Sequence, residues 1–289
     1  MQVVKCLMAD QYREWDEFVE QSPQGTIFSS SKWLTFMDLP FRIYAYYKNG
    51  NLLGGMANFG SPAPLTPFQG ILVKPLPDVK YTNQMSIYNE VANALVEYAP
   101  KRFYNHYTFA DIRPFKWSNW GVDIRYTYVV DLTDMDKLWD GLEKQTRYEI
   151  THARKDYLTW MTPDTNPFNI LYSETFKRKG IERPVDNEFI QRFCFTFNAA
   201  VFCTTTLYDT TSAAIFIEDN KRAYYILGAS DETGHTSSLT LWSAFDKLSK
   251  SGTKEVDLVG CNSRSIALFK RGFGGILMPY YGVRKERED

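Results

Sequence analysis

Apolar and polar positions alternate along the chain in a way that predicts short strands and amphipathic helices. The clearest stretch begins with a strand-like run at residues 223–227 and a polar segment at 230–237. Leu241, Phe245 and Leu248 then recur at helical spacing, Gly252 predicts the end of that helix, and residues 255–259 predict a second strand. If the two strands are parallel, the polar segment and the helix N-terminus lie where α/β folds bind ligands.

The same order of hairpin, helix and strand is predicted twice. The first copy comprises a hairpin at 41–59 with an Asn49-Gly50 turn, a helix at 83–98 and a strand at 102–109, with a further strand at 125–130. The second copy comprises a hairpin at 211–228 that turns at Asp219-Asn220, a helix at 237–250 and a strand at 254–259. The residues differ between the copies, so only the pattern repeats. We therefore predict an α/β protein of two similar domains.

Helices are also predicted at 12–20, 29–37, 166–179 and 186–200, and one long helix at 133–157 is expected to join the domains. Its apolar positions include Leu138 and Leu142, whereas Lys144, Arg147 and Arg154 fall along another stripe. That stripe is either a solvated face or an anion site. The predicted division is a first domain at 1–132, a connecting segment at 133–165 and a second domain at 166–289.

Composition narrows the protein class. The 289 residues suit two domains, and the 44% hydrophobic content supports a packed core. A formal net charge of -1 argues against a global field that attracts nucleic acid or anionic lipid. The four cysteines form no C-x-x-C pair, and the chain shows neither a leader-like segment nor an apolar run that could span a bilayer. We expect a cytoplasmic protein, and the sequence does not indicate its oligomeric state.

Metal and nucleophile chemistry are not predicted. His106, His152 and His235 lie far apart and lack the spacing of a zinc motif. The chain contains no nucleophile elbow and no P-loop. Cys261 follows Gly260 at the end of a predicted strand, where it is either a reactive thiolate or a buried apolar thiol.

A family resemblance is carried by residues 257–260 (DLVG), Ile266 and residues 269–275 (FKRGFGG). This pattern resembles the last subdomain of the Fem-type peptidyltransferases, which add amino acids from aminoacyl-tRNA to peptidoglycan precursors. It also resembles acetyltransferase-like proteins of the GNAT superfamily from polysaccharide operons. The resemblance is most specific at 269–275, extends over most of the chain, and implies tandem GNAT-like domains.

The resemblance also implies site residues. Lys270 corresponds to a lysine at the reaction centre that is proposed to stabilise an oxyanion, although a salt-bridged helix lysine is the plain alternative. Lys32, near Trp33, corresponds to a lysine that helps bind substrate phosphates. Arg147 matches an arginine that holds the diphosphate of a nucleotide-linked precursor, and Arg154 lies in the same segment.

Two further groups of candidates surround the polar segment. Asp257 and His235 are candidates to accept the proton of an incoming amine, because both lie near the predicted loop and strand end. GNAT acetyltransferases hold the coenzyme A pyrophosphate on a loop of pattern Arg/Gln-x-x-Gly-x-Gly/Ala. The corresponding residues here are Gly234, Thr236 and Ser237, without the basic residue. The preceding residues, Asp231 and Glu232, would repel phosphate unless they point away.

These features predict an acyltransferase that works by direct attack on an acyl donor and modifies a cell-envelope or polysaccharide precursor, such as a small molecule or a nucleotide-linked sugar. We expect acyl-CoA as the donor, because the helical arm of many tRNA-dependent members is not visible in the sequence. Two alternatives stay open. One is an aminoacyl-tRNA-dependent peptidyltransferase. The other is a non-catalytic GNAT-like protein that binds a nucleotide-linked sugar or a protein partner.

Overall fold

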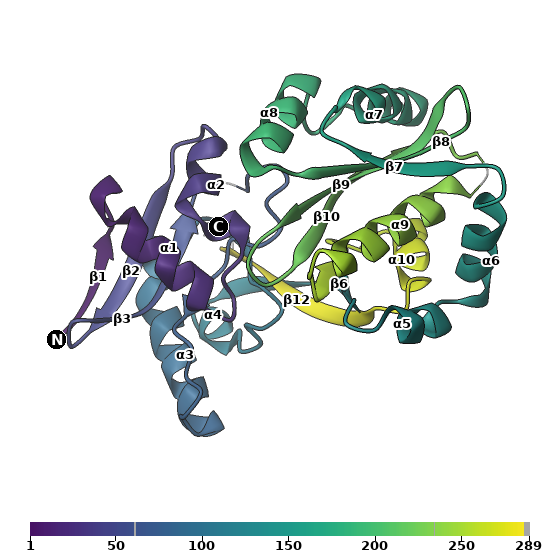
Figure 1. The fold of residues 1–289 in the computed structure, drawn as a ribbon. Coiled ribbons are helices and arrows are strands. Elements are labelled where there is room, and N and C mark those ends of the chain that lie inside the picture. Colours follow the sequence, from purple (N-terminus) through teal and green to yellow (C-terminus); the bar gives the residue numbers. More distant parts are fainter. Residues whose placement is uncertain (61, 234, 286–289) are drawn as a thin grey trace. The chain divides into compact units, whose positions relative to one another are not determined.

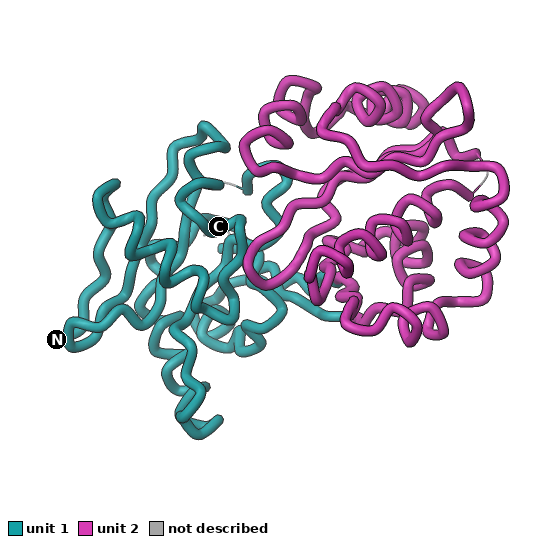
Figure 2. Tube along the Cα trace, viewed as in Figure 1, with its two compact units in different colours: residues 1–126, 278–289 teal, residues 127–277 magenta. Residues whose placement is uncertain are grey.

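The computed structural model describes residues 1–60, 62–233 and 235–285, and the chain divides into two compact units (Figure 2). Unit 1 comprises Met1–Tyr126 and Met278–Asp289, and unit 2 comprises Thr127–Leu277. Two strands, β6 (Trp120–Asp131) and β12 (Ile276–Lys285), contain residues of both units. The sequence-based division ends the second domain at residue 289, whereas most of the final strand belongs to unit 1.

Unit 1 contains an antiparallel sheet of order β1-β2-β3-β4. Its strands are β1 (Gln2–Cys6), β2 (Arg42–Lys48), β3 (Asn51–Asn58) and β4 (Leu72–Val73). Asn49 and Gly50 have φ of +52° and +80°, the left-handed geometry that tight hairpins favour. A further strand, β5 (Arg102–Tyr104), pairs antiparallel with β12, with Phe103 opposite Val283. This strand is shorter than the predicted run to residue 109.

The helices of unit 1 follow the predicted apolar faces. They are α1 (Tyr12–Gln21), α2 (Ser31–Phe36), α3 (Tyr81–Leu95) and α4 (Arg113–Trp117), with 3-10 turns η1 (Ala9–Gln11), η2 (Ile27–Ser29) and η3 (Val96–Tyr98). The Ser30 hydroxyl accepts a hydrogen bond from the Trp33 amide at 3.2 Å and so caps α2. On α3, Val91 and Leu95 are buried in a core that also holds Phe103.

Unit 2 contains strands in the order β6-β11-β10-β9-β8-β7. Besides β6, these are β7 (Leu158–Thr162), β8 (Ala200–Thr205), β9 (Thr210–Glu218), β10 (Ala223–Ser230) and β11 (Glu255–Asp257). Only β10 and β11 are parallel in this series, with Ala223 opposite Val256 and Tyr224 opposite Asp257. The predicted crossover is confirmed, and the polar segment lies at the carboxyl end of β10.

The helices of unit 2 are α5 (Met135–Gly141), α6 (Lys144–Ala153), α7 (Asn166–Lys179), α8 (Asn187–Phe197), α9 (Thr236–Lys250) and α10 (Arg264–Arg271). Within this unit, α7 and α9 lie on opposite faces of the strands β8 to β10 (Figure 1). The predicted bounds of α7 match the structure, and α9 begins one residue before its predicted start at 237.

The segment predicted as one long helix forms two helices instead. Leu142 and Glu143 separate α5 from α6 in extended conformation, with ψ of 147° and 145°. This break places the Leu142 side chain in the core of unit 2, while the Glu143 amide donates to the carbonyl of Gly272 at 3.0 Å. Burial of Leu142 and the new backbone hydrogen bond compensate for the helical bonds lost there.

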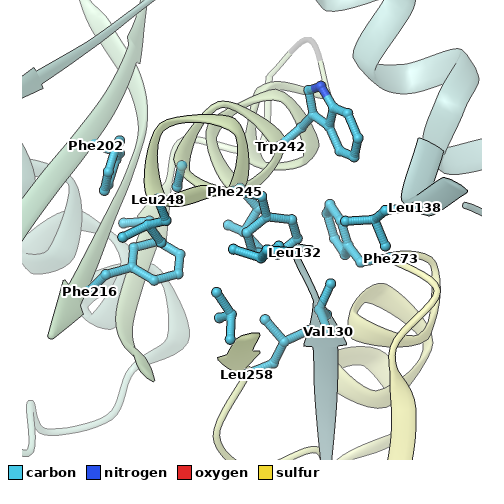
Figure 3. Close-up of a cluster of buried hydrophobic side chains, with 14 of the residues drawn as sticks. Val130, Leu132, Leu138, Phe202, Phe216, Trp242, Phe245, Leu248, Leu258 and Phe273 are labelled. Carbon is cyan, nitrogen blue, oxygen red and sulfur yellow. The ribbon is translucent and has the colours of Figure 1, made fainter. Parts of the chain in front are cut away.

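The core of unit 2 lies between the sheet and α9 (Figure 3). Phe216 of β9 meets Phe245 of α9 edge to face, with ring centroids 6.4 Å apart, and Phe245 in turn meets Phe273 at 5.5 Å. Both contacts have the edge-to-face geometry that aromatic quadrupoles favour. Phe245 therefore links the sheet to the segment that follows α10.

Replacing Phe245 with Ala should lower the free energy of unfolding by about 3–5 kcal/mol, because it removes a fully buried ring and leaves a cavity. Urea unfolding followed by circular dichroism checks this. Leu207→Ala is the matched control: Leu207 is 85% exposed at the β8–β9 turn, and its loss should change stability by less than about 0.5 kcal/mol. A similar loss for both variants would contradict the assigned core.

Candidate functional site

The strands β10 and β11 separate soon after they pair. Their described ladder covers Ala223 and Tyr224 only, whereas β10 continues to Ser230. The pairing of β10 with β9 shifts register between Tyr225 and Leu227, which marks a β-bulge. Along the second half of β10, the backbone groups on the side of β11 are thus available to hydrogen-bond a ligand. A bulge beside a diverging strand is a common way to place backbone groups and side chains at a site.

A pocket of about 210 Å³ lies at this end of β10. Elements α7, β9, β10, α9 and α10 all contribute to its walls. Its polar lining includes Thr175, Arg178, Ser212, Ser230, Glu232 and Ser237, and its apolar lining includes Tyr225, Leu241 and Phe269. We take this pocket as the candidate site.

Tyr225 gives the pocket a partly buried phenol. Its ring stacks on Phe216 with centroids 5.3 Å apart, and the Lys270 Nζ lies 5.3 Å from its centroid. The hydroxyl reaches back over Gly228, where a Cβ atom would come within 1.8 Å of it, so that a side chain at residue 228 would displace the phenol. Burial raises the pKa of Tyr225. The phenol therefore stays protonated at neutral pH and can donate a hydrogen bond.

Lys270 of α10 holds the turn that follows β11. The side chain is 7% exposed, and its ammonium donates to the carbonyls of Leu258, Val259 and Gly260 at 2.5, 2.7 and 2.8 Å. Val259 and Gly260 have φ of +46° and +67°, a conformation that is rare for a β-branched residue such as valine. The three protons of the ammonium are thus directed at backbone carbonyls.

Asp257 holds the same turn from the other side. Its Oδ1 accepts from the Thr127 hydroxyl at 2.5 Å and from the Val259 amide at 2.8 Å, while Oδ2 has no hydrogen-bond partner among the described residues. Burial raises the pKa of Asp257. Burial lowers the pKa of Lys270 to about 8, against the opposing effects of the Asp257 and Cys261 charges. Neither Lys270 nor Asp257 lines the pocket, and their catalytic roles stay predictions.

The two acidic residues of the polar segment are turned toward partners in the protein. Asp231 Oδ1 accepts from the Thr233 amide at 2.9 Å and from its hydroxyl at 2.7 Å. Glu232 forms an ion pair with Arg178 at 3.1 Å, and Arg178 also donates to the Ser230 carbonyl at 3.0 Å. These contacts lessen the repulsion that the sequence predicts between the segment and a phosphate.

Of the predicted cofactor-binding residues that the structure describes, one lines the pocket and one does not. Ser237 lines the pocket. Thr236 is buried and its hydroxyl donates to the Thr233 carbonyl, which closes the loop before α9. Gly234 lies outside the described residues. His235 precedes α9 with φ of +60°, and its Nδ1 lies 3.7 Å from a Glu149 carboxylate oxygen, away from the pocket lining.

The predicted anion-binding residues lie on two units. On unit 2, Arg147 Nη1 donates to the carbonyls of Trp139 and Asp140 at 3.3 and 2.7 Å, at the end of α5. The Arg154 guanidinium lies over the Trp139 ring at 5.5 Å. The structure thus brings Arg147 and Arg154 together around Trp139, whereas Lys32 lies on α2 of unit 1.

Tyr225, Arg178 and Ser212 are among the pocket residues that the sequence reasoning did not identify. Tyr225 falls in an apolar run that predicts a buried strand, and Arg178 belongs to a basic helix end, so neither pattern singles them out. The spacing of Tyr225 and Gly228 is the one local signal, because a glycine inside a strand often marks a bulge or a close approach.

Cys261 is 5% exposed, and burial raises the pKa of its thiol, which favours the buried apolar thiol over the reactive thiolate. Over residues 1–60, 62–233 and 235–285, no cluster of three or more His, Cys, Asp and Glu side chains is placed to hold a metal ion. Within those same ranges, none of the helices combines the length and the apolarity needed to cross a bilayer.

The pKa of Lys270 predicts a pH dependence of stability. The pKa of Lys270 is about 8 in the folded protein and 10.5 for an ordinary lysine. At pH values between these two, the unfolded chain therefore holds the proton of Lys270 more tightly than the folded protein does. The free energy of unfolding therefore rises with pH through this window. Lys270→Met should lose that rise, so that the stability of the parent relative to the variant grows by about 2 kcal/mol between pH 7.5 and 10. Urea unfolding of both proteins at each pH is the measurement, and a constant difference would contradict the assignment.

Comparison with known proteins gives structural matches only. No family model matches the chain, and no curated protein matches it in sequence. Among solved structures, FemX matches at a TM-score of 0.69 and 14% identity, over 96% of each chain. The C-terminal domain of a putative lysylphosphatidylglycerol synthetase from Agrobacterium fabrum matches at 0.60 and 12%, over 96% of this chain and 93% of that one. A tandem GNAT protein from the clavulanic acid biosynthesis pathway matches at 0.55 and 9%, over 100% of both chains. The chain therefore has the tandem GNAT-like, Fem-type fold that its sequence predicts.

Proposed function

We propose that this protein transfers an acyl or aminoacyl group to an amine or hydroxyl group of a cell-envelope or polysaccharide precursor. The observation that carries the proposal is the pocket at the free end of β10, where a phenol and several hydroxyls surround a space of acyl size. The likeness of the fold to FemX, to a lysylphosphatidylglycerol synthetase domain and to a tandem GNAT protein supports the reaction class by analogy.

The size of the pocket favours binding of the transferred group alone. A volume of about 210 Å³ accommodates a small acyl or aminoacyl group, whereas a coenzyme or nucleic acid carrier must remain outside it. We propose acyl-CoA as the donor. The contacts of Asp231 with Thr233 and of Glu232 with Arg178 support this choice, because each carboxylate already has a hydrogen-bond donor or a cation beside it. Ser237, at the start of α9, would then lie between the acyl group and its carrier.

The chemistry that this arrangement supports is direct transfer. An amine or hydroxyl of the acceptor attacks the acyl carbonyl, and a new C–N or C–O bond forms. The bond from the carbonyl to the carrier breaks, and the carrier leaves with the proton that the acceptor loses. The phenol of Tyr225 and the backbone of β10 beyond Tyr224 are placed to donate hydrogen bonds to the carbonyl oxygen as negative charge develops on it. Lys270 acts by holding the turn beside this strand and by its positive charge.

Binding of an acyl-CoA should raise the melting temperature of the protein, because a ligand of the native state stabilises it by mass action. We expect a shift of several degrees with acetyl-CoA or a longer acyl-CoA at about 100 times Kd, which corresponds to roughly 2.7 kcal/mol. Ser237→Tyr should abolish the shift by filling the pocket. Ser243→Tyr places the same change on the same helix away from this pocket and should retain it.

The same screen separates the alternatives. A shift with an aminoacyl-adenosine analogue but not with acyl-CoAs would favour the tRNA-dependent peptidyltransferase. A shift with UDP-sugars alone, unaffected by Ser237→Tyr, would favour the non-catalytic alternative and contradict the proposed function. Loss of binding in both serine variants would assign the effect to misfolding, which circular dichroism of each variant detects.

Arg147 is proposed to bind the phosphates of a nucleotide-linked acceptor. Arg147→Ala should weaken affinity for a UDP-sugar by roughly 1.5–3 kcal/mol, the range for one charge-assisted hydrogen bond. Isothermal titration calorimetry measures this. Lys137→Ala is the control, since Lys137 is an exposed cation on α5 and lies outside the stripe that contains Arg147. If the parent binds and Arg147→Ala binds equally well, Arg147 is not part of the site.

A further inference from the structure

The pocket at the end of β10 carries more positive charge than an uncharged acyl group requires. Arg178 and Lys179, from the last turn of α7, both line it, and among the described lining residues Glu232 supplies the carboxylate. The two cations therefore outnumber the anion. An excess of positive charge in a small concave site favours an anionic ligand.

Arg178 is positioned at the pocket and not at the end of its own helix. Cations in the last turn of a helix usually interact with the free carbonyls at its C-terminus. The Nη2 of Arg178 instead donates to the Ser230 carbonyl on β10 at 3.0 Å and to a Glu232 carboxylate oxygen at 3.1 Å. These two hydrogen bonds hold the guanidinium against the end of β10, at the wall of the pocket.

The guanidinium keeps donors for a ligand. It has five N–H groups, and both of its hydrogen bonds come from Nη2, so that Nε and Nη1 donate to none of the described residues. The side chain is 39% exposed, which leaves these groups within reach of a ligand. A charged donor that is already held in place forms a strong hydrogen bond with an anion at little further cost in side-chain entropy.

We propose that the transferred acyl group ends in a carboxylate and that Arg178 binds this carboxylate, with Lys179 adding positive charge. The substrate class is the monoacyl group of a short dicarboxylic acid, such as succinyl. This inference rests on the proposed function, because it takes the pocket as the site of the acyl group. A carboxylate fits better than a phosphate of the carrier, since a volume of about 210 Å³ holds the transferred group alone.

Glu232 moderates the charge of this site. Its side chain is 68% exposed, and an exposed ion pair of this kind contributes little to stability. It occupies Nη2, so the carboxylate of the ligand would approach the other nitrogens of Arg178. Because the charge of Glu232 weakens the positive potential at the guanidinium, removing that charge should strengthen the binding of an anionic acyl group.

Isothermal titration calorimetry with succinyl-CoA and butyryl-CoA tests the proposal, because the two acyl groups have the same carbon number and differ at the far end. The parent should bind succinyl-CoA about 10-fold more tightly or better, the effect of one charge-assisted hydrogen bond. Arg178→Gln should remove this preference and keep the affinity for butyryl-CoA. Glu232→Gln should increase the preference by roughly 2- to 5-fold. Lys177→Ala, in the same helical turn but outside the pocket lining, is the matched control and should retain it.

The outcomes separate this inference from the proposed function. A parent that binds both donors equally, or an Arg178→Gln variant that keeps the preference, overturns the inference and leaves acyl transfer in place. A parent that binds neither donor overturns the proposed donor and the inference together. If Arg178→Gln loses both donors, Glu232→Gln decides, and an unchanged preference in that variant overturns the inference.

An amino-acid acceptor also carries a carboxylate, so L-alanine and L-alaninamide are titrated in parallel. Arg178→Gln should leave the affinities for these two compounds unchanged relative to the parent. If the parent instead prefers L-alanine, loses that preference in Arg178→Gln and binds the two acyl-CoAs alike, the carboxylate belongs to the acceptor. That result overturns its assignment to the transferred group.

Discussion

The site depends on the ammonium of Lys270 and the turn that it holds. Val259 adopts a left-handed conformation that costs on the order of 1–3 kcal/mol and persists only where its surroundings impose it. Three carbonyls on the Lys270 ammonium and the Val259 amide on Asp257 impose it here. The burial of both charged groups is tolerated because they are hydrogen-bonded to the backbone and lie in the same turn.

The turn at residues 258–260 ends the pairing of β11 with β10. The pocket forms beside the part of β10 that is then unpaired with β11. Once β11 turns away, the second half of β10 lacks a neighbour on that side, and the bulge after Tyr225 redirects its side chains. The phenol of Tyr225 then lies over Gly228 and borders the pocket, while its ring connects Phe216 of the core to the Lys270 ammonium. Core packing, the strained turn and the pocket are therefore parts of one arrangement, in which the Lys270 ammonium lies near the ring of Tyr225 and that ring lines the pocket.

Lys270 also shows how a motif and a structure complement each other. The resemblance of residues 269–275 to Fem-type proteins predicts a lysine at the reaction centre, and Lys270 lies 5.3 Å from the centroid of a ring that lines the pocket. Its hydrogen bonds to three carbonyls favour action through position and electrostatic field over direct donation to a substrate. The family motif thus predicts a role for Lys270, whereas its contacts show that the ammonium holds the turn after β11.

The sequence by itself determined the elements whose signals are local. The Asn49-Gly50 hairpin, the helices α7 and α9, and the β10–α9–β11 crossover follow from turn residues and apolar spacing within a few turns of chain. The correspondence with the GNAT pyrophosphate loop also singled out Ser237, which lines the pocket. Only the tertiary structure decided the break at Leu142, the direction of Tyr225 and the return of β12 to unit 1. Each of these depends on residues distant in the chain, such as Gly272 for the break and Phe216 for Tyr225, and periodicity carries no information about such contacts.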